Sequence, residues 1–515
     1  MNGPMSETLR ATRPRHPPRR PLTELAGWLA AADPSARAHG DLDGDATGVT
    51  LASQRVLPGD VYAALPGTRA HGIEYVAAAA EAGAVAVLTD TEGGGRAPAG
   101  LPVLEVQSPR ALLGRFASYL YGDPATSLRL LGVTGTQGKT TTTRLAESAL
   151  QRSGVTSAVV GTVGTRVDGE EIKTTLTTPE APDLHGLFAM MRERSVAACA
   201  MEVSSHALVQ GRVDGVVFDV AVFTNLGRDH LDFHADEEDY FQAKATLFTP
   251  ERCRRGLVNA DDEHGRRLLA RGGVPLESFS ATGARAEWRA VDLDPAPNGT
   301  RFTVEGPDGL RVRTGCPLPG SYNVANALAA LAGCALLGYD LDAVAASMAA
   351  GGGVPGRLEL VDAGQDFTVV VDYAHKPDAV AAAIAALRPL TEGRVIVVLG
   401  AGGERDPGKR PLMGAIAAAA ADVLVVTDDN PRGEEPAAIR AELLAGTREG
   451  SAEVLEVGDR RAAIREALAR ARAGDVVLVA GKGHETGQEV AGVVHPFDDR
   501  EVVRQIIRED MGEAS

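Results

Sequence analysis

The sequence predicts an α/β protein with three domains, a small N-terminal α/β domain followed by two doubly wound domains. Two observations support this prediction. The chain has 515 residues, more than a single hydrophobic core usually organises. Short apolar runs typical of buried parallel strands also alternate with alanine-rich helical stretches, and this series starts again after Gly353. We expect domains at 22–126, 127–353 and 354–515, after a tail at 1–21.

The first domain shows β-like runs at 61–65 (VYAAL) and 84–90 (AVAVLTD), with the helix-like stretch YVAAAAEAG between them. The second begins near 128, where the apolar run LRLLGVTG leads into a glycine-rich turn and then the helix-like KTTTTRLAESALQRSG. Further strands are expected at VAACAMEVSS and VVFDVAVFTNL. Both end in polar residues, as expected of parallel strands whose carboxyl ends face a site.

The third domain is predicted from four apolar runs separated by alanine-rich helices: FTVVVDYAH, GRVIVVLGAGG, ADVLVVTDDN and GDVVLVAGKGH. Strand and helix alternate throughout this part of the chain. We therefore expect a second doubly wound, Rossmann-like sheet, the C-terminal Rossmann-like domain of the protein.

Composition narrows the function classes. A formal net charge of −17 argues against a nucleic-acid-binding surface, and no apolar run approaches the ~20 residues of a membrane span. The Arg-rich and Pro-rich residues 1–21 predict a disordered tail, not an export signal, because the segment after Arg20 is short and carries Glu24. The four cysteines are widely spaced, which favours reduced thiols. We expect a cytoplasmic protein.

The run GVTGTQGKTTTT (132–143) joins a predicted strand to a predicted helix. In such a loop backbone N–H groups face phosphate oxygens, Lys139 can reach the β- and γ-phosphates, and the Thr140 hydroxyl can hold Mg²⁺. The spacing departs from the general phosphate loop, because Val133 replaces a glycine. A glycine-rich turn without a ligand is the alternative. We expect an ATP site that includes Gly135, Thr136, Gln137, Gly138, Lys139, Thr140 and Thr141.

The GTxGKTT form of this loop resembles that of the Mur ligase family, to which folylpolyglutamate synthases also belong. The stretches MEVSSHALVQGRVDG, TNLGRDHLDFH and FQAKATLF follow in the family's order. The resemblance implies Mg²⁺ ligation by Glu202 and His230 together with Thr140, and a carbamylated Lys244 that helps to place a second ion. Lys139, Lys244 and His230 are the implied catalytic residues. Without the motifs, the alternative for Lys244 is a solvated helix lysine, and the alternative for His230 is a structural or surface histidine.

Resemblance also extends the nucleotide site. PGSYNVANALAA points to Asn323 and Asn326, for which helix capping is the alternative, GRLE points to Arg357, and DYAHKPDAV points to Asp372. The family's UDP-recognition segment is similar to 51–76, with Ser53 as the clearest position. For the dipeptide side of a UDP-sugar-dipeptide substrate, the resemblance implies Thr177, Thr178, Ser204, Gln210 and Arg212.

Three segments of the third domain resemble the members that add diaminopimelate: GAGGERDPGKRPLMG, TDDNPRGEEP and GKGHE. The implied contacts are Arg405, Asp429, Asn430, Pro431, Arg432, Gly481 and Glu485. Arginines can grip the distal carboxylate of diaminopimelate, and Asp429 and Glu485 can accept hydrogen bonds from its distal ammonium. Lysine lacks that carboxylate and would leave an arginine unpaired. The meso or LL form stays open, because charge matching suits either.

The resemblance implies a monomeric, ATP-dependent, ADP-forming ligase of peptidoglycan precursor synthesis. Its partners would be UDP-N-acetylmuramoyl-L-alanyl-D-glutamate, diaminopimelate and ATP, with Mg²⁺ as cofactor. Addition of L-lysine, or of glutamate to folate, is the alternative within the family. A nucleotide-gated binding protein without ligation is the alternative outside it. Gln137 and Ala401 depart from the family, which usually has Asn and often has Cys there.

Overall fold

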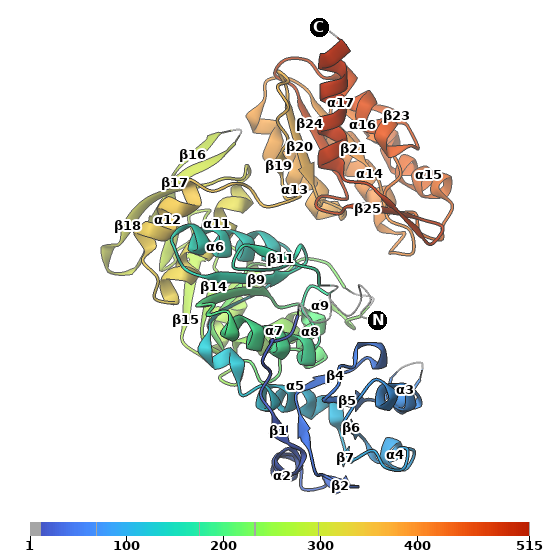
Figure 1. Ribbon diagram of the computed structural model, residues 1–515. Coiled ribbons are helices and arrows are strands. Elements are labelled where there is room, and N and C mark those ends of the chain that lie inside the picture. The colour runs from blue at the N-terminus through green and yellow to red at the C-terminus, as the bar shows by residue number, and fades with distance from the viewer. Residues whose placement is uncertain (1–11, 68–69, 175, 231–232, 297, 514–515) are drawn as a thin grey trace. The chain divides into compact units, whose positions relative to one another are not determined.

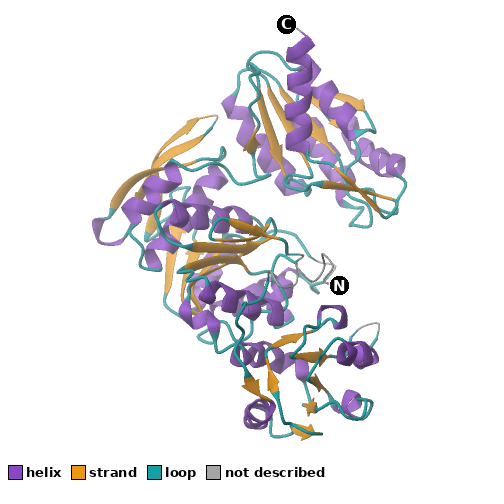
Figure 2. Cartoon of the chain, in the orientation of Figure 1, coloured by secondary structure: helices purple, strands orange, loops and turns teal. Residues whose placement is uncertain are grey.

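The computed structural model describes residues 12–67, 70–174, 176–230, 233–296 and 298–513 (Figure 1). The chain forms two compact units. The first contains the chain up to 289 with 305–310 and 326–347, and the second contains 290–304, 311–325 and the residues from 348 onwards. Each unit has its own hydrophobic clusters and contains both helices and strands (Figure 2).

The first unit begins with a five-stranded sheet of order β2-β7-β6-β5-β4, in which only β2 is antiparallel to its neighbour. Successive side chains of β5 lie on opposite faces of the sheet. Val61 and Ala63 pack with α2 and α5, and Tyr62 packs with α3 on the other face. The elements are β1 (Arg20–Pro21), α2 (Leu22–Ala32), β2 (Arg37–His39), β3 (Asp45–Ala46), β4 (Gly48–Thr50), η1 (Ser53–Arg55), β5 (Asp60–Ala64), η2 (Gly72–Tyr75), α3 (Val76–Glu81), β6 (Ala86–Thr89), α4 (Thr91–Gly94), β7 (Val103–Glu105), α5 (Pro109–Leu120) and η3 (Pro124–Ser127).

Residues 12–21 correct one prediction. We expected a disordered tail at 1–21, and 1–11 lie outside the described residues. From Thr12 onwards the segment is held: β1 pairs with β3, and the Arg13 guanidinium lies buried 2.5 Å from the Asp60 carboxylate. Arg13 also donates to the Val49 carbonyl at 3.2 Å. A composition typical of disorder was misleading here because one arginine finds a buried carboxylate partner.

A parallel sheet forms the rest of the first unit. Its strand order runs β11-β10-β9-β12-β8-β13-β14-β15, with β9 to β15 parallel and the β10–β11 hairpin antiparallel at one edge. Beyond β15 the sheet continues with β16 (Trp288–Ala296), β17 (Gly299–Glu305) and β18 (Arg311–Cys316). The elements are β8 (Arg129–Thr134), α6 (Lys139–Arg152), β9 (Ser157–Gly161), β10 (Gly164–Val167), β11 (Glu170–Ile172), α7 (Ala181–Glu193), β12 (Ala198–Glu202), α8 (Ser205–Val209), β13 (Phe218–Phe223), α9 (Glu237–Ala245), η4 (Thr246–Phe248), β14 (Cys253–Asn259), α10 (Glu263–Arg271) and β15 (Leu276–Ser280). The strands β8 and β12, central in this order, carry the polar residues at their carboxyl ends.

The second unit contains a six-stranded sheet of order β19-β20-β24-β21-β22-β23, parallel except for β19. Val397 of β21 packs with α13 and α14, whereas its neighbours Ile396 and Val398 pack with α16 and α17. The sheet is therefore covered by helices on both faces, as the doubly wound prediction requires.

The remaining elements are η5 (Pro307–Gly309), α11 (Ser321–Leu336), α12 (Leu341–Ala349), β19 (Glu359–Leu360), β20 (Thr368–Asp372), α13 (Pro377–Leu387), η6 (Arg388–Leu390), β21 (Val395–Leu399), α14 (Lys409–Ala420), β22 (Val423–Val426), α15 (Pro436–Gly446), η7 (Thr447–Glu449), β23 (Glu453–Glu456), α16 (Arg460–Arg470), β24 (Val476–Ala480), β25 (Gly487–Val490), β26 (Val493–Pro496) and α17 (Asp499–Glu513).

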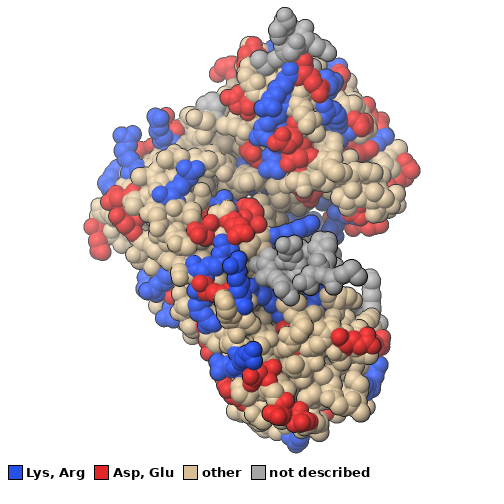
Figure 3. Space-filling view, viewed as in Figure 1, with Lys and Arg blue, Asp and Glu red and all other residues tan. Residues whose placement is uncertain are grey.

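Acidic and basic side chains are interspersed on the face drawn in Figure 3. The four cysteines are buried and free of disulfide bonds. Among the described residues, no helix combines the length and apolar character that crossing a membrane requires.

The Arg13–Asp60 pair generates a stability prediction. Burial raises the pKa of the Asp60 carboxyl, and the Arg13 guanidinium opposes that rise. Because Arg13→Ala leaves a buried carboxylate without its cation, we expect it to lower the unfolding free energy of the N-terminal sheet by about 3 kcal/mol. The exposed Arg19 supplies a control, and Arg19→Ala should cost less than about 0.5 kcal/mol.

The measurement is urea denaturation followed by Trp28 fluorescence in a Trp288→Phe background, so that the signal comes from the N-terminal sheet alone. Trp28 stacks on Tyr119 with ring centroids 5.4 Å apart, and Trp288 is the only other tryptophan. Equal midpoints for the two arginine variants would contradict the prediction.

Candidate functional site

The predicted phosphate loop connects β8 to α6, and its shape depends on the carboxyl end of β13. The Thr136 N–H donates to the Asn225 carbonyl and the Gln137 N–H to the Asn225 side chain, both at 2.9 Å. The Thr224 hydroxyl donates to the Gln137 carbonyl at 2.6 Å. Gly135 has φ +150°, and a Cβ there would overlap the Thr224 hydroxyl. Only glycine therefore fits this position.

Two lysines converge on this loop. The Lys139 ammonium donates to the carbonyls of Gly135 at 2.7 Å and Thr136 at 3.1 Å, and the Lys244 ammonium donates to the same Gly135 carbonyl at 2.9 Å. Lys244 comes from α9, is 1% exposed, and lies 4.3 Å from the centre of the Tyr240 ring. Both sequence-predicted lysines thus lie at the loop, where positive charge suits bound phosphate.

Glu202 lies at the carboxyl end of β12, in register with Val133 of the loop-bearing strand β8. Its side chain is buried and accepts hydrogen bonds from the Thr162 N–H at 2.8 Å and the Thr162 hydroxyl at 3.1 Å. The carboxylate is therefore held rigidly beside the start of the phosphate loop. Thr162 is a residue that sequence reasoning missed, because a threonine after an apolar run carries no distinctive signal.

His230 lies between β13 and α9 in a left-handed backbone conformation, with φ +55°. Its Nε2 is 3.2 Å from the Asp229 carboxylate, and its ring is 4.8 Å from that of His206 and 6.0 Å from that of Tyr240. Within the described part of the chain, no three His, Cys, Asp or Glu side chains form a metal cluster.

This donor set suits Mg²⁺ better than a cation that needs a complete protein cage. Mg²⁺ usually takes one or two protein ligands, with nucleotide oxygens and water completing its shell. The buried Glu202 carboxylate and the Thr140 hydroxyl in the first turn of α6 fit such a role, with His230 as a further ligand. A carbamate on Lys244 would keep an N–H that can donate to Gly135 while adding a negative charge.

The residues predicted for the dipeptide share one polar network, which extends from Glu202: Thr177, Thr178, Ser204, Gln210 and Arg212. The Thr178 hydroxyl donates to the Glu202 carbonyl at 2.8 Å and accepts from the Ser204 N–H at 3.2 Å. Arg212 donates to the Thr178 carbonyl at 3.2 Å and to the Gln210 side chain at 2.7 Å. The Thr177 hydroxyl lies 3.0 Å from that of Thr162.

Ser53, the predicted UDP-segment residue, lies buried in η1 of the same unit. Its neighbour Arg55 pairs with Asp183 at the start of α7 at 2.8 Å. Glu180, the residue before α7, pairs with Arg212 at 2.9 Å and with Arg110 of α5 at 3.0 Å. Sequence reasoning missed these links, which place the UDP segment against the helix that follows Thr177 and Thr178.

Of the two predicted adenine-side residues, Asn326 lies at the phosphate loop. A Cβ on Gly138, which has φ +85°, would overlap the Asn326 side-chain oxygen. Asn323 lies one turn earlier in α11 and donates from its amide to the Pro319 carbonyl at 2.7 Å. The helix-capping alternative for Asn323 therefore stays open, since Pro319 lies two residues before the start of α11.

Arg357 and Asp372 lie together in the second unit. The Arg357 guanidinium lies 4.7 Å from the centre of the Tyr373 ring, and the buried Asp372 carboxylate accepts from the N–H groups of Leu358 at 2.7 Å and Ala374 at 2.8 Å. Burial raises the pKa of Asp372, and both the Arg357 charge and the backbone N–H groups oppose the rise. The carboxylate thus fixes the segment that carries Arg357.

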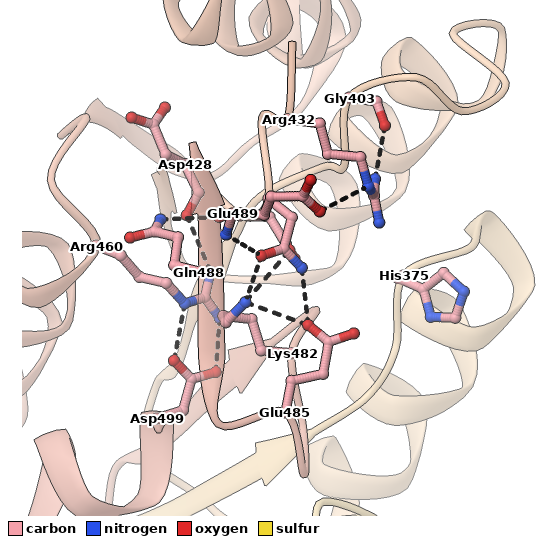
Figure 4. Close-up of polar contacts among 12 residues, drawn as sticks. His375, Gly403, Asp428, Arg432, Arg460, Lys482, Glu485, Gln488, Glu489 and Asp499 are labelled. Atoms are coloured by element: carbon pink, nitrogen blue, oxygen red, sulfur yellow. Dashed lines mark hydrogen bonds and ion pairs between the residues drawn. The ribbon is translucent and has the colours of Figure 1, made fainter. Parts of the chain in front are cut away.

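The predicted diaminopimelate residues come from the loops after β21, β22 and β24, and Figure 4 shows Arg432 and Glu485 of this set. Asn430 donates to Glu485 at 2.8 Å, and Arg432 donates to the Gly403 carbonyl at 2.6 Å. A Cβ on Gly481 would overlap the Asp429 carboxylate, and one on Gly403 would overlap the Pro431 carbonyl. Arg405 lies in the same loop as Gly403. The carboxyl ends of three parallel strands thus bring both signs of charge together.

Comparisons with known proteins agree with this geometry. The Mur ligase catalytic domain matches residues 45–121, the middle domain 133–334, and the glutamate ligase domain 356–483. A UDP-N-acetylmuramoyl-L-alanyl-D-glutamate–2,6-diaminopimelate ligase of Streptomyces avermitilis is 54% identical over 508 residues, which cover 97% of this chain and 99% of that protein. This chain belongs to the Mur ligase family. The predicted three-domain α/β fold is thereby confirmed.

Other Mur ligases are similar over comparable lengths. The ligase of the same description from Streptomyces coelicolor is 53% identical over 500 residues, covering 96% of this chain and 97% of that protein. A solved structure of a UDP-N-acetylmuramoyl-L-alanyl-D-glutamate–2,6-diaminopimelate ligase has a TM-score of 0.65 at 33% identity, and the match covers 92% of this chain and 97% of that one.

The departure of this Mur ligase at Gln137 leaves the loop intact. Its backbone N–H and carbonyl make the contacts with Asn225 and Thr224, so the loop's shape depends on the main chain. Ala401, the second departure, is buried directly after β21. Neither substitution removes a contact that the structure uses to hold the site together.

We expect Gly135→Ala to weaken ATP binding at least about tenfold, because the new Cβ displaces the loop from Thr224 and with it the phosphate-facing N–H groups. Gly27→Ala in α2 is the matched control, since a Cβ there meets nothing within 4 Å. Calorimetric titration with Mg²⁺–ATP measures both variants, and circular dichroism verifies that both are folded. Unchanged affinity in folded Gly135→Ala would show that the loop is not the nucleotide site.

Proposed function

We propose that this Mur ligase joins 2,6-diaminopimelate to the D-glutamate of UDP-N-acetylmuramoyl-L-alanyl-D-glutamate and converts ATP to ADP and phosphate. The observation that carries the proposal is the cluster after β21, β22 and β24, where Arg432 and Arg405 lie with Asp429 and Glu485. A set that combines guanidinium and carboxylate groups matches the distal carboxylate and ammonium of diaminopimelate. The names of the relatives at 53–54% identity support the same substrate.

In the first step, an oxygen of the D-glutamyl side-chain carboxylate attacks the γ-phosphorus of ATP, and the bond to the β-phosphate oxygen breaks. The products are an acyl phosphate and ADP. Lys139 and the N–H groups of the phosphate loop stabilise the charge that develops on the phosphate oxygens. Asn326 lies at this loop, and Asn323, Arg357 and Asp372 bind the nucleoside side of ATP.

Thr140, Glu202, His230 and the carbamylated Lys244 would hold Mg²⁺, which when bound neutralises negative charge on the phosphate groups. Ser53 binds the UDP part of the sugar substrate. The network of Thr177, Thr178, Ser204, Gln210 and Arg212 binds the dipeptide beside Glu202 and places its carboxylate toward the phosphate loop.

In the second step, the amine of diaminopimelate attacks the acyl carbon, an amide bond forms, phosphate leaves, and the amine proton passes to solvent. No protein nucleophile is needed. Asn430, Pro431 and Gly481 shape the loops that orient the amino acid. L-Lysine would leave the guanidinium groups without a carboxylate, which opposes it as a substrate. The proposal includes a cytoplasmic, monomeric enzyme.

Phosphate release from ATP tests the proposal directly. The assay contains UDP-N-acetylmuramoyl-L-alanyl-D-glutamate and, in separate arms, meso-diaminopimelate, LL-diaminopimelate, L-lysine or no amino acid. We expect turnover with a diaminopimelate isomer, and the active isomer defines the stereochemistry. Turnover with lysine alone would overturn the assignment of the substrate, and no turnover in any arm would favour a nucleotide-gated binding protein.

We expect Lys139→Ala to lower kcat for ADP formation about 10²-fold or more, because the loop loses the cation that reaches the transferring phosphate. Lys173→Ala, which removes an exposed lysine, is the control and should retain the activity of the unchanged protein. Coupled spectrophotometric detection of ADP measures both. Full activity in Lys139→Ala would refute the role of Lys139.

A further inference from the structure

Lys482 is a fully buried lysine in the turn that follows β24. Its ammonium donates to the Glu485 carboxylate at 3.2 Å (Figure 4). It also donates to the Asn430 side-chain oxygen at 2.9 Å and lies 3.9 Å from the Asp429 carboxylate. Three of the proposed diaminopimelate contacts thus share one cation, to which the proposed function assigns no role. An ammonium without solvent contact is costly unless it is paired, so the pairing is strongly constrained.

The first consequence concerns the orientation of the Asn430 amide. Its oxygen accepts from the Lys482 ammonium and from the Glu489 N–H at 3.0 Å, so its nitrogen must face the Glu485 carboxylate, 2.8 Å away. Asn430 holds one oxygen of Glu485, and Lys482 contacts the same oxygen. The other Glu485 oxygen is left as the acceptor for a ligand ammonium.

The second consequence concerns charge. Asp429 and Glu485 contribute two carboxylates, and the Lys482 ammonium balances one of them. The remaining single negative charge matches one substrate ammonium. If Lys482 were neutral, the two carboxylates would repel each other in a partly buried site, and their present positions would be destabilised.

The surroundings of Lys482 are rigid on both sides. On one side, Gln488 of β25 donates to the Asp429 carbonyl at 2.8 Å, and the Arg432 N–H donates to the Glu489 carbonyl at 3.0 Å. On the other side, Arg460 forms a fully buried pair with Asp499 at 2.7 Å and donates to the Ala480 carbonyl at 3.0 Å. The loop that carries Asp429 and Asn430 therefore has few alternatives to the arrangement that Lys482 imposes.

We propose that Lys482 is a positioning residue that sets the charge and the geometry of the half of the site that binds the distal ammonium of diaminopimelate. This inference rests on the proposed function. Arg405 and Arg432 serve the carboxylate half, and neither contacts Lys482. Removal of the Lys482 cation therefore affects the recognition of one end group of the substrate more than that of the other.

Two amino-acid substrates distinguish recognition of the distal ammonium from recognition of the distal carboxylate. 2-Aminopimelate keeps the distal carboxylate and lacks the distal ammonium, whereas diaminopimelate has both. We expect Lys482→Met to lower kcat/KM for diaminopimelate at least about tenfold and kcat/KM for 2-aminopimelate less than about threefold. The ratio of the two kcat/KM values, which measures the preference for diaminopimelate, should therefore fall. KM for ATP should be unchanged in the variant. Lys173→Met, at an exposed lysine, is the matched control and should keep the preference of the unchanged protein.

If Lys482→Met does not fold, Lys482→Gln supplies the same test, because it keeps hydrogen-bond donors and removes the charge. Equal losses of kcat/KM for both amino acids would mean that Lys482 supports the fold alone, and this result would overturn the inference. Unchanged kcat/KM for both amino acids would overturn it as well. Failure of the proposed function is distinct, since it would appear as absence of diaminopimelate turnover in the unchanged protein.

Discussion

The carbonyl oxygen of Gly135 is the point on which the nucleotide-binding part of the structure depends. It accepts hydrogen bonds from both Lys139 and Lys244, which are far apart in the sequence. Gly135 has φ +150° beside the Thr224 hydroxyl, a backbone conformation and a close approach that only glycine allows. One backbone conformation thus links β8, α6, β13 and α9, because the two lysine side chains meet at a carbonyl whose position is sterically fixed.

In the second unit, charged and polar side chains hold one another in position through hydrogen bonds. Asp429, Asn430, Glu485 and Lys482 form a network in which one Glu485 oxygen remains for a ligand, and the Glu489 N–H of β25 adds a backbone donor. A network of this kind is stable only when it is fully satisfied. It also means that a ligand meets side chains whose orientations are already determined, so little entropy is lost when the ligand binds.

Sequence reasoning predicted the strands that end at the sites, because apolar runs followed by polar residues are a local signal, as at Glu202 and Asp429. The residues predicted for the dipeptide came from the family resemblance alone, and the structure connects them in one hydrogen-bond network. It failed for Arg13, whose burial depends on Asp60, a partner 47 residues away that no local pattern reveals. Thr162, Glu180 and Lys482 were missed for the same reason, since their importance comes from tertiary contacts. The roles of the site residues stay predictions.

The ordered N-terminal segment has a consequence for the order in which the chain is completed on the ribosome. The N–H groups of Arg15 and His16 donate to the Glu193 carboxylate at 2.7 and 2.9 Å, so a segment synthesised well before α7 is anchored by the last residue of that helix. Domains generally fold as they emerge, from the N-terminus onwards. The first sheet can form early, but its leading segment becomes fully held only after α7 has left the exit tunnel.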